Sequence, residues 1–196
     1  MLFYFELGEF VLCSEVLSSL EVSPVIAAIK DKDFDKALNS PAQVIFLLGG
    51  EISTVAERIK AAKAVNKFIF IHIDLADGIG KDKSGIRFLA KCNADGIIST
   101  KTNLIRFAKE LGLITIQRFF VYDSHGMNSI NDVLLNTNPD IIEIMPGIMG
   151  KIVEKFSRLD VPLIAGGLIE TKSEVTTALS LGAFAVSTGK EELWYI

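Results

Sequence analysis

The sequence predicts an α/β fold, a single compact (β/α)8 barrel of the TIM type with an N-terminal helix. Short runs of β-branched residues alternate with helical stretches at intervals of about 20 to 28 residues, the rhythm of parallel βα units. Most of these runs are apolar on both faces, which is typical of parallel strands covered by helices. The last two runs end in glycines and small hydroxyl residues, as the phosphate-binding loops of such barrels often do.

Eight runs qualify as strands, which is the number that a closed barrel needs. A five-stranded doubly wound sheet would leave about three of them without a place. The chain of 196 residues is shorter than the roughly 250 residues common for these barrels. The predicted strands lie at residues 25–29, 44–48, 68–73, 96–99, 114–119, 141–145, 163–165 and 183–187.

Apolar residues at spacings of three and four predict an amphipathic helix over residues 9–20, before the first strand. We therefore assign residues 1–23 to an N-terminal helical extension and residues 24–196 to the barrel. Thr54 and Thr171 are each followed three residues later by glutamate, a capping-box pattern that predicts a helix start after the second and seventh strands.

Composition and charge exclude some classes of binding partner and of cellular location for this protein. The chain has a mean hydropathy of +0.40, a net charge of −4 and a pI of about 5.3. The molecule as a whole therefore does not attract nucleic acid or an anionic membrane, and either could bind only to a local basic face. Its two cysteines, Cys13 and Cys92, lie far apart without a CxxC pattern, so we expect no disulfide and no zinc site. We expect a cytoplasmic protein without a signal peptide, membrane helix, metal or cofactor.

The loops after the last two predicted strands form the strongest candidate site. Gly166 and Gly167 end one strand, and Ser187, Thr188 and Gly189 end the next. Glycine allows close approach of a backbone to a ligand, and a helix start presents free N–H groups with partial positive charge. The two loops together predict a site for a phosphate or another anion.

Polar residues inside apolar strands form a second group of candidates, because a buried polar group needs a partner or a function. We expect His72 and Asp74 to share one face of a strand, Thr115 and Gln117 to share one face of another, and Glu143 to interrupt a third. If they point inward, these five side chains line the upper barrel and its mouth. For His72, a hydrogen-bonded position in the core is a simpler interpretation than a role as a metal ligand.

Two cations stand at strand ends beside these residues. Lys101 and Arg118 could hold a phosphate, or they could pair with Asp74 and Glu143 in a purely structural network. If the protein were an enzyme, Asp74 or Glu143 would be its general base and Lys101 its electrophile. His125, in a loop at the barrel mouth, is expected to be solvent-exposed.

Several stretches together resemble the glycerol-3-phosphate-responsive antiterminator family, which regulates bacterial glycerol operons. The resemblance extends over most of the chain, from residue 24 to residue 194. The stretches that carry it are PVIAAI (24–29), VIFLLGG (44–50), HIDLADG (72–78), GIISTK (96–101), TIQRFF (115–120), IEIMPGIM (142–149), IAGGLI (164–169) and AVSTGKEELW (185–194).

This resemblance implies a barrel without catalytic activity that binds glycerol 3-phosphate and then the leader region of an mRNA. The glycines and hydroxyl residues after the last two strands would hold the phosphate, and Asp74, Glu143 or Gln117 would bind the glycerol hydroxyls. Two alternatives remain: an isomerase, lyase or synthase that acts on a small phosphorylated substrate, and a phosphate-ester sensor that acts through a protein partner. The oligomeric state is open, and a homo-oligomer is one alternative.

Overall fold

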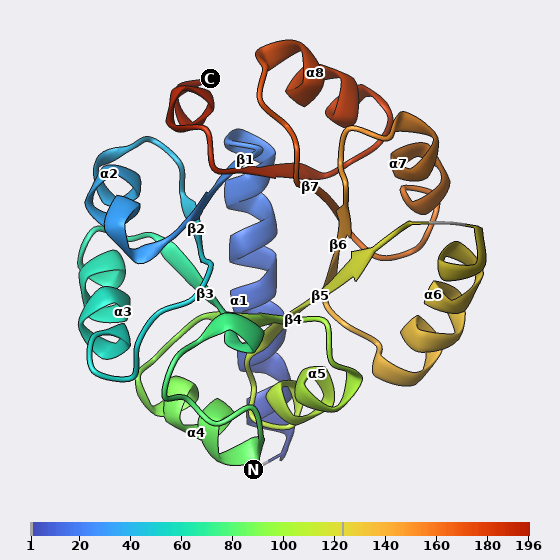
Figure 1. Cartoon of the computed structure of the whole chain (residues 1–196). Coiled ribbons are helices and arrows are strands. Elements are labelled where there is room, and N and C mark those ends of the chain that lie inside the picture. The colour runs from blue at the N-terminus through green and yellow to red at the C-terminus, as the bar shows by residue number, and fades with distance from the viewer. Residues whose placement is uncertain (1, 123) are drawn as a thin grey trace.

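The computed structural model describes residues 2–122 and 124–196, without the side chains of residues 2–11 and 124–129. Eight parallel strands pair in chain order, and the last pairs with the first, so the sheet is a closed barrel (Figure 1). This confirms the predicted fold and excludes the doubly wound sheet. The strands are β1 (Val25–Ile29), β2 (Val44–Leu47), β3 (Phe68–His72), β4 (Gly96–Ser99), β5 (Ile114–Phe120), β6 (Ile141–Met145), β7 (Leu163–Gly166) and β8 (Ala185–Thr188).

Helices surround the barrel, and short elements explain how fewer than 200 residues close it. Most strands have four or five residues, α2 has six, and only a 3₁₀ helix follows β8. The α-helices are α1 (Leu2–Val22), α2 (Phe34–Asn39), α3 (Val55–Ala64), α4 (Lys83–Lys91), α5 (Thr102–Lys109), α6 (Ser124–Thr137), α7 (Gly150–Phe156) and α8 (Lys172–Ser180). The 3₁₀ helices are η1 (Asp31–Asp33), η2 (Ile73–Leu75) and η3 (Glu191–Tyr195). No helix in the described part of the chain is both long and apolar enough to span a membrane.

Helix α1 lies across the barrel behind its opening (Figure 1). Val16 and Leu20 on this helix are fully buried in one apolar cluster with residues at the beginnings of strands, among them Val44, Ile114 and Ile141. The helix therefore closes the amino end of the barrel, and only the carboxyl end opens to solvent. The predicted N-terminal helix is confirmed, but it begins at Leu2 and not at residue 9.

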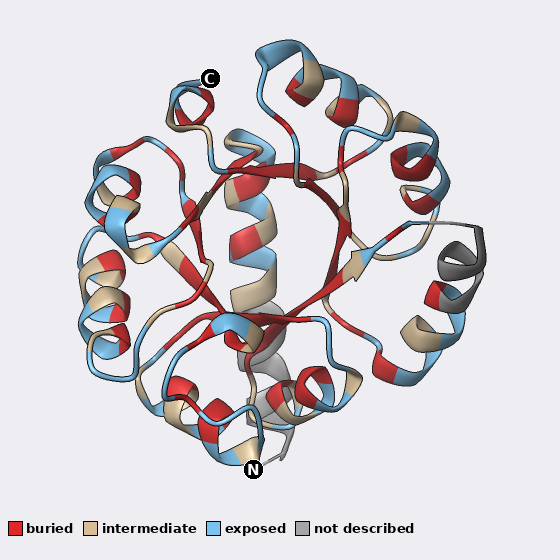
Figure 2. Ribbon diagram, in the orientation of Figure 1, coloured by how far each residue is buried: buried red, intermediate tan, exposed pale blue. Residues whose placement is uncertain are grey.

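Most residues of the strands are buried, as Figure 2 shows, and because side chains alternate along a strand, both faces of the sheet are covered. One apolar cluster fills the barrel interior and a second lies between the barrel and its helices. The predicted capping box of α8 is present: the Thr171 hydroxyl accepts from the Glu174 amide, and the Glu174 carboxylate accepts from the Thr171 amide. The one predicted for α3 is wrong, because the Thr54 side chain caps no amide. Its hydroxyl instead lies 3.5 Å from the carbonyl oxygen of Glu51.

Candidate functional site

A cavity of about 460 Å³ opens at the carboxyl end of the barrel. Its wall consists mainly of residues from β5, β6 and the loops after β7 and β8, and it combines backbone, charged and apolar groups. Ligands of (β/α)8 proteins bind at this end of the strands. The lining residues are Ala28, Leu48, Arg118, Glu143, Met145, Gly167, Leu168, Ile169, Glu170, Ser187, Thr188, Gly189 and Lys190.

The loops after β7 and β8 are tied together on one side of this cavity. The Thr188 hydroxyl donates a hydrogen bond of 2.7 Å to the carbonyl oxygen of Ile169. Gly167 and Leu168 both have a left-handed backbone, with φ of +79° and +60°, which is uncommon for leucine and costs conformational energy. The two loops that the sequence predicts to be neighbours therefore do face one cavity, and tertiary contacts hold their backbone in place.

A buried ion pair forms the floor of the cavity. The Arg118 Nε donates to Glu143 Oε2 at 2.6 Å, and the Ser187 hydroxyl donates to Glu143 Oε1 at 2.6 Å. Both oxygens of this fully buried carboxylate therefore have a partner, which a buried charge requires. A Cβ atom on Gly166 would lie 2.4 Å from Glu143 Oε1, so only glycine fits beneath this carboxylate.

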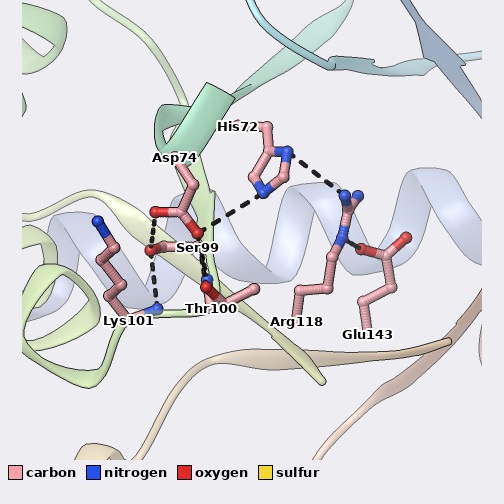
Figure 3. A network of polar contacts seen from close by, with 7 residues as sticks. All are labelled: His72, Asp74, Ser99, Thr100, Lys101, Arg118 and Glu143. Carbon is pink, nitrogen blue, oxygen red and sulfur yellow. Dashed lines mark hydrogen bonds and ion pairs between the residues drawn. The ribbon is translucent and has the colours of Figure 1, made fainter. Parts of the chain in front are cut away.

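Arg118 also sets the state of the buried His72 ring (Figure 3). The Arg118 Nη1 lies 3.4 Å from His72 Nδ1, and because a guanidinium only donates, Nδ1 must accept and Nε2 carries the proton. Burial, together with the positive charge of Arg118, lowers the pKa of His72 to about 4, so the ring is neutral at pH 7. The Nε2–H group has no hydrogen-bond partner among the described residues, since Asp74 Oδ2 is 3.8 Å away.

Asp74 is held by hydroxyl and amide groups at the end of β4. Its carboxylate accepts hydrogen bonds from the Ser99 hydroxyl at 2.7 Å and from the amide and hydroxyl of Thr100 at 2.7 and 2.8 Å (Figure 3). Burial alone would raise the pKa of Asp74, but these hydrogen bonds outweigh it and the pKa lies below its ordinary value. The carboxylate is therefore ionised and already bonded at neutral pH.

The predicted alternative of two structural ion pairs is half right. Arg118 and Glu143 are paired, but Asp74 and Lys101 are not. The amide of Lys101 donates to the Ser99 hydroxyl at 3.0 Å, while its side chain is exposed and does not line the cavity. Asp74 misses Lys101 because β3 ends at His72 and the 3₁₀ helix η2 turns Asp74 towards Ser99 and Thr100.

Thr115 and Gln117 share one face of β5, but this face does not point into the barrel, so the condition for lining its mouth is not met. Gln117 Oε1 accepts a hydrogen bond from the Thr137 hydroxyl on α6 at 2.6 Å, and the Thr115 hydroxyl donates to Asp140 Oδ2 at 2.6 Å. Ile114, Ile116 and Arg118 of the same strand point inward, so the alternating residues point towards the helices. Gln117 therefore lies outside the cavity.

The cavity also has an apolar side that the sequence did not single out. Met145, Leu168 and Ile169 line it, and the only signal that marks them is their position at strand ends. His125 lies outside the residues whose side chains are described. Within the described residues, no group of three or more His, Cys, Asp or Glu side chains could hold a metal ion.

Replacement of His72 by glutamine is expected to flatten the pH dependence of stability. Its pKa is about 4 in the folded protein and about 6.5 in the unfolded chain, so the unfolded chain binds more protons between these values. The wild type should lose up to about 3 kcal/mol of unfolding free energy as the pH falls from about 6.5 to 4.

Urea unfolding of both proteins at several pH values between 7 and 4.5 measures this difference. The other histidine, His125, is present in both proteins and cancels in the comparison. Parallel pH profiles of the two proteins would contradict the assignment of a neutral buried ring.

The fold and the cavity define a (β/α)8 barrel protein with a partly charged cavity at the carboxyl ends of its strands. Residues 25–194 match the model of the family described as "Glycerol-3-phosphate responsive antiterminator". The chain belongs to this family.

The chain is also similar to individual proteins, and the names of two solved structures among them refer to a glycerol uptake operon antiterminator. The uncharacterized protein YgcP of Escherichia coli (strain K12) is 37% identical over 91% of this chain and 95% of its own length. The crystal structure of the glycerol uptake operon antiterminator regulatory protein of Listeria monocytogenes has a TM-score of 0.82 and 36% identity over 87% of this chain and 94% of that one. A glycerol uptake operon antiterminator-related protein of Thermotoga maritima has a TM-score of 0.78 and 30% identity, over 88% of this chain and 98% of that one.

Proposed function

We propose that the protein is an antitermination regulator that binds glycerol 3-phosphate in the cavity and the leader mRNA of a glycerol operon on its surface. The family and the solved relatives support the regulatory class. The observation that carries the ligand proposal is the cavity itself, in which two backbone loops face a buried arginine and glutamate. Its volume of about 460 Å³ lies within the range of about 300 to 1,000 Å³ for small-molecule sites.

The phosphate would lie between the loops at Gly167 and Gly189, where glycine leaves the backbone accessible. Two cations, Lys190 and Arg118, and two carboxylates, Glu143 and Glu170, line the same cavity, so the positive charge for a phosphate ester would come mainly from Lys190. At the rim, Lys190 lies 3.5 Å from Glu170 in an exposed pair, which gains little energy and can open when an anion enters. Ser187 and Thr188 act by holding Glu143 and the loop backbone in place.

The glycerol hydroxyls would lie on the opposite side of Arg118. Glu143 retains lone pairs beyond its two hydrogen bonds, and the His72 Nε2–H is a buried donor in need of an acceptor. Neither His72 nor Asp74 lines the cavity, and His72 Nε2 lies only 3.8 Å from Asp74 Oδ2, so the glycerol hydroxyls would bind to Glu143 and not between these two residues. Gln117 is no longer a candidate, because it faces α6.

The same geometry disfavours the enzyme alternative. Lys101 is exposed and outside the cavity, Asp74 accepts three hydrogen bonds, and Glu143 is paired with Arg118, so no free base and electrophile converge on one point. Solved aldolases that share the fold are only 8 to 12% identical to the chain, and that likeness shows the fold alone.

Calorimetry with glycerol 3-phosphate, glycerol and inorganic phosphate tests the ligand proposal. The phosphate ester is expected to bind at least about a hundredfold more tightly than either fragment, because only the ester reaches both halves of the site, and a hundredfold is about 2.7 kcal/mol. It should be recovered unchanged after incubation. Equal affinity for phosphate and the ester would reduce the cavity to a general anion site, and turnover of the ester would favour an enzyme.

Gel-shift titration with the leader transcript of the glycerol-uptake operon, from the genome that encodes this chain, tests the RNA proposal. Affinity should rise when glycerol 3-phosphate is present, because a ligand shifts a two-state protein only through its different affinity for the two states. Affinity should also fall with salt, since contacts to RNA phosphates release counterions. Ligand binding without any RNA binding would support a sensor that acts through a protein partner.

A further inference from the structure

Large apolar side chains are exposed on three consecutive loops at the barrel mouth. One of them, Phe120, is the last residue of β5, and the others follow β5, β6 and β7, strands that are neighbours in the sheet; each is between 44% and 86% exposed. Exposed apolar residues grouped in this way usually mark a binding surface. We call the group the apolar rim, and it consists of Phe120, Tyr122, Ile148, Met149 and Leu168.

The apolar rim adjoins the ligand cavity. Leu168 belongs to both, and Met145, which lines the cavity, pairs with Phe120 in the register of β5 and β6. Leu168 is also the residue with left-handed backbone beside Gly167. A ligand that repositions the loop after β7 therefore changes the cavity and the rim together.

The rim contains a stacked pair of exposed aromatic rings. The ring centroids of Phe120 and Tyr122 are 6.1 Å apart and their planes differ by 9°. Unpaired RNA bases stack on aromatic side chains of this kind, and stacking tolerates any base because every base has a π-face. Because the two rings stack on each other, the outer face of the pair is what suits a nucleobase.

Two lysines flank the apolar rim, and carboxylates occur both in the rim's own loops and on the opposite side of the mouth. Lys101 and Lys151 lie at the starts of α5 and α7, whereas the loops that carry the rim contain two carboxylates in the sequence, Asp123 beside Tyr122 and Glu170 two residues after Leu168. On the other side of the barrel, Asp31, Glu51 and Asp77 line a second cavity after β1, β2 and β3. A polyanion would therefore approach the rim from the side of Lys101 and Lys151.

We infer that the apolar rim is the RNA-binding surface of the protein, with Phe120 and Tyr122 stacking on unpaired bases and Lys101 and Lys151 contacting phosphates. This inference rests on the proposed function and names the residues that carry its RNA step. The acidic net charge is compatible with it, because only one sector of the mouth meets RNA.

Alanine at Tyr122 or Phe120 is expected to weaken binding of the leader transcript by about tenfold or more, from loss of one stacking platform. Tyr122→Phe should bind RNA like the wild type, because the ring and not the hydroxyl stacks. The matched control is Tyr195→Ala, which removes an exposed tyrosine after β8, outside the rim. All four variants should bind glycerol 3-phosphate with wild-type affinity in calorimetry.

The outcomes separate this inference from the function on which it rests. If the wild type binds RNA and both alanine variants stay within twofold of it, the rim is the wrong surface and the proposed function stands. If the wild type binds no RNA, both proposals fail. Sedimentation that shows dimers of the wild type and monomers of the alanine variants, with RNA affinity unchanged, would overturn the inference and assign the rim to self-association.

Discussion

Replacement of Arg118 by leucine is expected to destabilise the barrel by about 3 to 5 kcal/mol. The substitution would leave the Glu143 carboxylate without a counter-charge. Glu143 is fully buried, and Arg118 supplies the only positive charge that contacts it among the described residues. An unpaired charge in a barrel interior costs more than the intact pair contributes. His72 would also lose the donor that fixes its tautomer.

The double variant Arg118→Leu, Glu143→Gln tests this explanation. Glutamine removes the charge but its amide oxygen can still accept from Ser187, so the double variant should recover at least half of the lost stability. Urea unfolding of the wild type, both single variants and the double variant gives the coupling free energy. Independent, additive effects of the two substitutions would show that the pair does not act as a unit.

Valine at Gly167 is expected to reduce the affinity for glycerol 3-phosphate by at least about a hundredfold, equivalent to about 2.7 kcal/mol. A β-branched residue is strained at φ +79°, and its Cβ would lie 2.6 Å from the Cε atom of Met145, which also lines the cavity. The methionine tip can move, but only by changing the shape of the proposed phosphate site.

The matched control is Gly112→Val. This glycine has a similar left-handed backbone, with φ of +75°, but it lies before β5 at the closed end of the barrel. Both variants should lose about 1 to 3 kcal/mol of stability, and only the Gly167 variant should lose the ligand. Unchanged affinity of the Gly167 variant in calorimetry would refute the proposed pocket, and an equal loss in both would point to a global effect.

The barrel could be predicted because its signals are local. Each strand is a short apolar run, and glycine, proline or polar residues separate it from the next helix, so the count of eight needed no tertiary information. The ends of elements were less certain. Asp74 was assigned to the face of a strand, but the chain turns into η2 after His72. The sequence did not predict this turn, because a strand whose last residues are apolar or aromatic has no strong stop signal.

The direction of side chains in β5 was beyond sequence reasoning. When both faces of a strand are buried, apolar residues occur on both, and alternation alone does not say which set is inside. The register with β4 and β6 decides this, and it places Arg118 inside with Glu143 and Gln117 outside with Thr137. The polar residues were thus recognised correctly as candidates and assigned only partly correctly to a face.

By itself, the sequence determined the eight-stranded barrel, the open end at which polar groups collect, and the two glycine-rich loops, because each follows from residue type and spacing along the chain. Only the tertiary structure decided that Arg118, Glu143 and Ser187 meet in one buried network, that the His72 ring is neutral, and that Lys101 stands apart. Hydrogen bonds and burial depend on which strands become neighbours and on their register, and these are properties of the closed barrel as a whole.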